Sequence, residues 1–166
     1  MKIRQISLAG ATVALLAMTP AWADKTPPPP LWSVTYPDGL ACDGFDLLIQ
    51  GWGGNRQFKT FKDKNGNVVR SLDAGTGTAL LFTNGTTGKT FSTESNGAVH
   101  HIKYNPGGSY TETDTGHDVI ILFPTDNPPG PTTTLIAGRV VFTVDASGNF
   151  NVQSMHGNIT DICAVL

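Results

Sequence analysis

The chain has 166 residues, which is enough for one hydrophobic core and too few for two full domains. Its formal net charge is −2, and its lysines and arginines form no cluster. This balance excludes the electrostatic contacts by which basic proteins hold nucleic acid or anionic membranes.

Residues 1–23 have the pattern of a signal peptide. Lys2 and Arg4 give a positive start, and the apolar stretch over 8–18 is too short to cross a bilayer. Ala-Trp-Ala at 21–23 places small residues at the two positions that a signal peptidase inspects. We therefore expect a secreted or extracellular protein of the cell envelope, without a membrane span once the signal is removed. The mature chain would carry nine basic and thirteen acidic residues.

A proline-rich linker is predicted over residues 24–37. Four consecutive prolines at 27–30 favour the extended polyproline conformation and offer no backbone donor to a sheet. We assign residues 38–166 to a single all-β domain.

Within this domain, short runs of β-forming residues alternate with turn signals. Asn-Gly pairs at 84–85 and 96–97 favour tight hairpin turns, because both residue types tolerate positive φ. Nineteen threonines follow residue 23, against two glutamates in the whole chain, and β-branched side chains suit pleated sheets. Strands are predicted over 45–50, 56–62, 68–72, 78–83, 89–95, 98–104, 109–115, 118–123, 135–144 and 150–156.

About ten strands joined by mostly short links predict an antiparallel meander. An up-and-down barrel is favoured, because closure removes vulnerable sheet edges, and a two-sheet sandwich is the alternative. The strand over 109–115 has little apolar content on either face, so we assign it to an outer edge or a wet rim.

Two cysteines, Cys42 and Cys163, lie near the two ends of the mature chain. In an oxidising compartment they predict one disulfide, the alternative being free or metal-binding thiols. A bridge that encloses so long a loop is worth about 4–5 kcal/mol in the chain-entropy model. It would also fasten the first strand to the last.

The longest apolar runs of the mature chain flank a proline-rich loop. Residues 118–123 and 135–144 are predicted to be neighbouring core strands, and the prolines of 124–134 exclude helix or paired strand between them. This loop consists mainly of prolines, threonines and one aspartate. We therefore interpret it as a rigid rim, with a possible role as a contact surface and none as an active-site lid.

Three C-terminal segments carry a resemblance to a known group of proteins. They are GHDVIILFPTD at 116–126, GRVVFTVD at 138–145 and TDIC at 160–163. In these segments the chain resembles small exported actinobacterial proteins that share a signal peptide and an early cysteine. The resemblance implies export and a β fold. The group has no assigned activity, so the resemblance carries no catalytic residue to this chain.

The histidines are the main candidates for chemistry. Strand alternation sends His100 and His101 to opposite faces, and His100 shares its face with Ala98, Ile102 and Tyr104. A zinc or acid–base site would require His100 to meet His117 or His156, with Asp114 or Asp118 nearby. The sequence contains no HExxH motif and no paired histidines on one strand face. We therefore assign no metal, no cofactor and no catalytic residue.

Aromatic side chains near glycine-rich bends are the candidates for ligand contact. Trp52, Trp32 and Tyr104 would line a mouth that stacks a ring. The candidate ligand-binding residues are His100, Tyr104, Trp52 and Phe45. The turn at 63–67 has oxygen side chains at alternate positions, like the start of a calcium loop. Its glycine comes too early and no glutamate closes it, so a hairpin turn is the better interpretation there and at 145–149.

Low charge and missing motifs favour a binding or structural role over catalysis. The first hypothesis is an exported non-catalytic barrel or sandwich that binds a small, partly apolar ligand. The alternative is an envelope or host-facing protein-interaction domain, and a second alternative is a small barrel isomerase, cyclase or hydrolase. The enzyme would require His100 beside a carboxylate at a cavity. The ligand hypothesis expects an interior cavity lined by Phe45, Leu47, Ile49, Ile121 and Val141.

Overall fold

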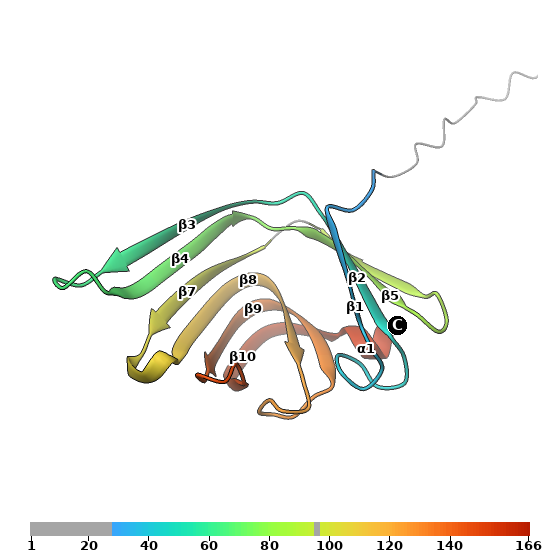
Figure 1. The fold of residues 1–166 in the computed structure, drawn as a ribbon. Helices are drawn as coiled ribbons and strands as arrows, with labels where there is room; N and C mark the ends of the chain where they lie inside the picture. Colours follow the sequence, from blue (N-terminus) through green and yellow to red (C-terminus); the bar gives the residue numbers. More distant parts are fainter. Residues whose placement is uncertain (1–27, 95–96) are drawn as a thin grey trace, which may run out of the picture.

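The computed structural model describes residues 28–94 and 97–166, so the predicted signal peptide lies outside the described residues. These residues form ten strands in two antiparallel sheets, with one short helix at the C-terminus (Figure 1). The prediction of an all-β, antiparallel chain with about ten strands is confirmed.

The smaller sheet has four strands in the order β1-β2-β5-β6. Strand β1 lies within the segment that the sequence assigned to the linker. The bounds are β1 (Trp32–Tyr36), β2 (Leu47–Trp52), β5 (Ala79–Asn84) and β6 (Thr90–Thr93).

The larger sheet has six strands in the order β10-β9-β8-β7-β4-β3. Figure 1 shows β8, β9 and β10 as arched strands, with the smaller sheet and helix α1 (Ile162–Val165) at one end of the arch. The bounds are β3 (Asn55–Lys62), β4 (Val68–Thr76), β7 (Ala98–Tyr104), β8 (Tyr110–Leu122), β9 (Thr132–Val144) and β10 (Phe150–Asp161).

Three stretches of chain bend from one sheet into the other: β2 into β3, β4 into β5, and β6 into β7. Each crossing contains glycine, at Gly53 and Gly54, at Gly77 and at Gly97. Gly53, Gly54 and Gly97 have φ of 67°, 96° and 55°, a region in which other residues are strained. If each bent pair is counted as one strand, the chain follows the predicted meander, because β2 pairs with β5 and β4 pairs with β7.

The preferred prediction of a closed barrel is wrong. Within the described residues β1 and β10 lie at the edges of different sheets and do not pair. The glycine bends turn the smaller sheet over the C-terminal half of β8, so that the first part of the meander lies over the last part and does not meet its edge. The result is the sandwich-like arrangement that the sequence offered as the alternative.

A row of glycines continues the bend across the larger sheet. Gly116 of β8 pairs with Gly138 of β9, which pairs with Gly157 of β10. The backbones approach so closely that a Cβ added to Gly138 would lie 2.0 Å from the carbonyl oxygen of His156. The sequence predicted two strands separated by Gly116. The structure has one strand, because glycine lets β8 arch there without breaking its pairing.

Two hydrophobic clusters result from this arch. One fills the space between the smaller sheet, the C-terminal half of β8 and helix α1. The other packs along β8, β9 and β10 on their opposite face. The first contains Ala41, Cys42, Phe45, Leu47, Ile49, Phe82, Ile162 and Leu166, and the second contains Ile120, Leu122, Ile136, Val140, Phe142 and Val144.

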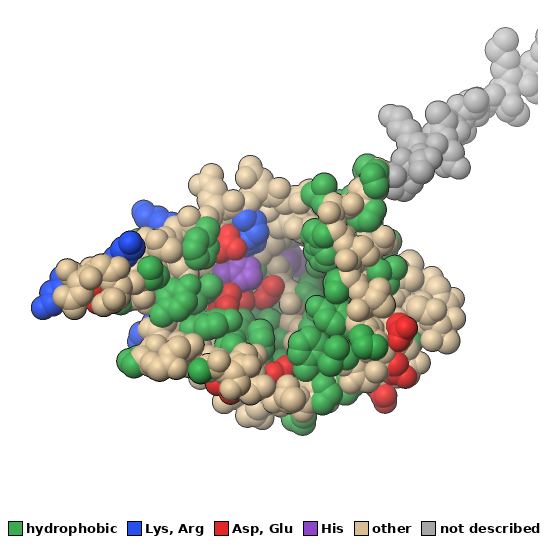
Figure 2. Space-filling model, viewed as in Figure 1, with side chains coloured by type: hydrophobic (Ala, Val, Ile, Leu, Met, Phe, Trp, Pro, Cys, Tyr) green, Lys and Arg blue, Asp and Glu red, His purple; other side chains and the backbone are tan. Residues whose placement is uncertain are grey.

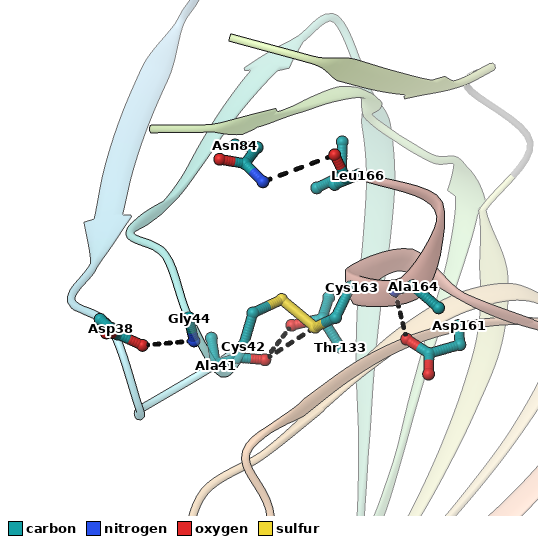
Figure 3. Close-up of a disulfide and its surroundings, with 10 residues drawn as sticks. All are labelled: Asp38, Ala41, Cys42, Gly44, Asn84, Thr133, Asp161, Cys163, Ala164 and Leu166. Atoms are coloured by element: carbon teal, nitrogen blue, oxygen red, sulfur yellow. Dashed lines mark hydrogen bonds between the residues drawn. A yellow bond between two sulfur atoms is a disulfide. The ribbon is translucent and has the colours of Figure 1, made fainter. Parts of the chain in front are cut away.

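The predicted disulfide between Cys42 and Cys163 is present, and the two Cα atoms lie 5.5 Å apart (Figure 3). It joins the loop after β1 to helix α1, and Cys42 is fully buried in the first cluster. The Thr133 hydroxyl donates to the carbonyl of Ala41 at 2.8 Å, which fixes this loop to β9. The bridge therefore connects the two ends of the meander through the core.

The proline-rich loop is ordered by one buried carboxylate. Asp126 accepts hydrogen bonds from the backbone amides of Phe123 and Phe150, at 2.6 and 2.8 Å. The aspartate of this loop thus has a structural role, which agrees with the expectation of a rigid rim.

Loss of the disulfide should lower stability strongly. The bridge spans 121 positions, so a Cys42→Ala/Cys163→Ala variant should lose about 4 kcal/mol of unfolding free energy. Urea unfolding of the variant and of the oxidised parent measures the difference. A loss of less than about 1 kcal/mol would show that the bridge does not constrain the unfolded chain as this model requires.

The glycine row should tolerate no side chain. Gly138→Ala places a methyl group against the β10 backbone and should cost at least about 3 kcal/mol. Gly148→Ala is the matched control, since its methyl group has nothing within 4 Å and only the φ of 90° opposes it, at about 1–2 kcal/mol. Equal losses in urea unfolding would contradict the close approach of the strands.

Candidate functional site

A hollow opens where the two sheets separate at the glycine bends. Its volume is about 270 Å³, close to the lower end of small-molecule sites. Figure 2 shows histidine, acidic and basic side chains gathered in a depression that apolar side chains surround. The apolar part of the lining is Trp32, Leu80, Ala98, Val119 and Leu135, and the polar part includes Arg56, Thr78, Thr93, Glu94, His100, His117 and Asp118.

Strand pairing brings a polar cluster to one side of this hollow. His100 of β7 lies opposite Asp114 of β8, and Glu112 follows on the same face of β8 because side chains alternate along a strand. Asp73 of β4 lies opposite His100 on its other side. The three central strands of the larger sheet thus present one histidine and three carboxylates together.

The His100 imidazole sits between two carboxylates. Its Nδ1 lies 2.9 Å from Oε1 of Glu112, with hydrogen-bond geometry, and 3.0 Å from Oδ1 of Asp114. The side chains of Glu112 and Asp114 are only 12% and 1% exposed. Among the described residues, Oδ1 of Asp114 has no hydrogen-bond partner. A buried carboxylate oxygen without one is costly, so this arrangement requires an explanation.

The charged groups of the cluster shift one another's pKa values. The carboxylates of Asp114 and Glu112, both at 3.0 Å or less from Nδ1, raise the pKa of His100 to about 10, so the imidazole is a cation at neutral pH. Burial, together with the charge of Asp114, raises the pKa of Asp118 to about 7. Burial also raises the pKa of Glu112, against the opposing effect of His100. The carboxylates of this poorly solvated cluster outnumber its single imidazole.

Arg56 connects three strands beside the cluster. Its Nε donates to Oδ2 of Asp73 at 2.9 Å, and an NH2 group donates to the carbonyl of Ala98 at 2.9 Å. The guanidinium is thereby engaged by Asp73 and the backbone. It fixes the position at which β3, β4 and β7 leave the bend, and its charge is directed to Asp73.

The four predicted ligand-binding residues do not come together. His100 lines the hollow, whereas Phe45 is packed in the core between the sheets. Tyr104 lies near the far end of β7, where its hydroxyl is 3.2 Å from that of Ser71. Trp52 lines an apolar depression on the outward face of the smaller sheet, and its Nε1 donates to the carbonyl of Pro28.

The expected interior cavity is also differently placed. Phe45, Leu47 and Ile49 belong to the packed core, and Ile121 packs against it. Trp32, which the sequence suggested as a mouth residue, does line the hollow. Its indole covers Gly51, where an added Cβ would lie 2.3 Å from the ring.

The histidines separate in a similar way. His117 lines the hollow with His100 and Asp118, but it is not part of the cluster that His100 forms with Glu112 and Asp114, so the structure does not show the His100–His117 pair that one sequence alternative required. His156 is exposed on the edge strand β10. The expected partners of His100 included Asp114, which does contact it, but they did not include Glu112.

The polar strand over 109–115 was assigned from the sequence to an outer edge or a wet rim, and this prediction is wrong. Its residues form the N-terminal half of β8, which is paired on both sides with β7 and β9. Glu112 and Asp114 stand two residues apart in a threonine-rich strand, a spacing that places both carboxylates on one face. That spacing opposite a histidine-bearing strand is the signal that would have indicated the cluster.

No protein-family model matches the chain, and no curated protein or solved structure is significantly similar to it. The site is therefore interpreted from its own geometry. In the part of the chain that the structure describes, no helix is both long and apolar enough to cross a membrane.

The cation of His100 should stabilise the cluster. His100→Gln leaves Glu112 and Asp114 without their positive neighbour and should cost about 2–3 kcal/mol, below the range for fully buried pairs because the imidazole is 23% exposed. Asp114→Asn alone should cost less than about 1 kcal/mol, since His100 keeps Glu112. Urea unfolding of both variants and of the double variant measures the coupling between the two residues. Additive losses would contradict the proposed interaction.

Proposed function

We propose that this is an exported, non-catalytic binding protein that holds a small, partly apolar ligand in the hollow between its sheets. The observation that carries the proposal is a hollow whose lining combines aromatic and aliphatic side chains with charged ones. Binding sites for small molecules typically combine an apolar lining with a few placed polar groups.

The chemistry of the walls defines the class of ligand. Trp32 offers the face of an indole, and Val119 and Leu135 extend the apolar wall. The polar part of the lining presents His100 and Asp118, with Thr78 at the bend. A molecule with a ring for Trp32 and a hydrogen-bonding group for the polar wall would satisfy both.

Export is part of the same proposal. The sequence has the pattern of a signal peptide, and the Cys42–Cys163 disulfide is of a kind that persists in oxidising compartments. If the protein is exported, it would meet its ligand outside the cell.

A pair of tryptophan variants tests the binding site. Titration with a naphthalene sulfonate dye should show saturable binding, and Trp32→Ala should weaken it about tenfold, or about 1.4 kcal/mol. Trp52→Ala is the matched control and should leave the affinity unchanged, because Trp52 lines the outward apolar depression instead.

Chemical-shift mapping of the same titration locates the dye. Perturbed amides should include His117, Val119 and Leu135, which line the hollow and not the outward depression. If the dye instead perturbs Ala79 and Leu81, or if Trp52→Ala removes binding while Trp32→Ala does not, the hollow is not the binding site.

Acid–base catalysis is the second candidate function. The observation that favours it is His100 at the hollow beside Asp118, with Glu112 holding its Nδ1. The two functions are distinguished by the fate of a ligand once one is found. A ligand recovered unchanged supports binding, whereas conversion by the parent protein but not by His100→Gln supports an enzyme.

A further inference from the structure

We propose that His100, Glu112 and Asp114 form a binding site for a divalent transition-metal ion, and that Zn²⁺ is the ion that suits it. Nδ1 of His100 and one carboxylate oxygen from each of the other two residues all lie within 4.8 Å of one another. One imidazole nitrogen and two carboxylate oxygens are a donor set that zinc takes in proteins.

Two of the three separations between the donors match those around a bound ion. Ligands held at about 2.1 Å lie about 3.0 Å apart at adjacent octahedral positions and about 3.4 Å apart in a tetrahedron. Nδ1 of His100 is 2.9 Å from Oε1 of Glu112 and 3.0 Å from Oδ1 of Asp114. Small adjustments of the two side chains would therefore place all three donors around one ion.

An independent observation points to a missing partner. The Asp114 side chain is 1% exposed, it is directed at His100, and its Oδ1 has no hydrogen-bond partner among the described residues. Such an oxygen would ordinarily accept a hydrogen bond, because leaving it without one costs free energy. Its contact with Nδ1 of His100, at 3.0 Å, does not have hydrogen-bond geometry, and a metal ion at the centre of the cluster would supply a direct bond to this oxygen.

The balance of charge supports the same conclusion. Glu112 and Asp114 place two carboxylates beside one imidazole, while Arg56 is already bound to Asp73. A dipositive ion would offset the excess negative charge of this poorly solvated site.

The strands hold the donors in place before an ion arrives. Glu112 and Asp114 are fixed on one face of β8, which is paired on both sides, and His100 is paired opposite Asp114. His100 also lines the hollow, so water would reach an ion on that side. Three protein ligands with an accessible further position are the arrangement of catalytic zinc sites. This proposal does not rest on ligand binding in the hollow.

The test uses the mature protein without an affinity tag, treated with a chelator and then dialysed. Calorimetric titration with Zn²⁺ should give one site per chain, and saturating Zn²⁺ should raise Tm by several degrees. Ca²⁺ should bind at least a hundredfold more weakly, because it prefers oxygen ligands alone. Ca²⁺ binding as tight as Zn²⁺ binding would overturn the assignment of the ion.

Three variants assign the ligands. Asp114→Asn and Glu112→Gln keep side-chain size and should each weaken Zn²⁺ binding at least tenfold. His156→Gln is the matched control, because it removes an exposed histidine of β10 and should leave the affinity unchanged. Absence of Zn²⁺ binding by the parent protein, or a loss with His156→Gln and not with Asp114→Asn, would overturn the proposal.

A spectroscopic readout separates ligand loss from unfolding. Co²⁺ bound by the parent protein should give visible absorption bands, which Asp114→Asn should remove while the near-ultraviolet circular dichroism of the folded chain is retained. Bands that survive in Asp114→Asn would show that the ion lies elsewhere.

Discussion

The bend along the glycine row is the constraint on which the rest of the structure depends. With each bent pair counted as one strand, the meander has seven strands: β1, the three bent pairs, β8, β9 and β10. Closure of such a meander into a barrel was the preferred prediction. Gly53, Gly54 and Gly97 turn the first half of the meander over the second, and Gly116 and Gly138 let the remaining strands arch beneath it. The two hydrophobic clusters exist because the arch gives β8 and β9 apolar neighbours on both faces. The disulfide between Cys42 and Cys163 then fastens the folded-over ends through the core.

Much of this fold follows from the sequence because the signals involved are local. Turn residues and β-branched runs indicated the strands, and the presence of only two cysteines, in a chain with a predicted signal peptide, indicated their pairing. Closure is different, since it depends on where a strand bends and in which direction. A glycine between two runs, such as Gly116, has the same pattern whether it ends a strand or arches one. The sequence therefore supports both a barrel and a sandwich, and only packing decides between them.

The site was less predictable for a related reason. Alternation placed His100 on the correct face, and Asp114 was among its expected partners. Glu112 was missed because its strand has few apolar residues, and a polar strand ordinarily lies at an edge. Here that strand is paired on both sides, and its acidic residues contact His100, which lines the hollow. Trp52 was selected as an aromatic residue near a bend, and Phe45 as a residue that would line a cavity. The side of the sheet on which each side chain lies depends on tertiary packing, which the local sequence does not specify.

The placement of these charges argues that the cluster is more than a by-product of folding. A central strand that held leucine or valine in place of Glu112 and Asp114 would bury apolar surface and avoid the desolvation of two carboxylates. The protein instead keeps an imidazole between them and leaves one oxygen of Asp114 without a hydrogen bond. Through His100, the cluster also adjoins the hollow that opens between the two sheets. Groups whose burial is costly, and which adjoin a hollow through His100, form the pattern expected of a binding site, and the proposed metal site would account for them.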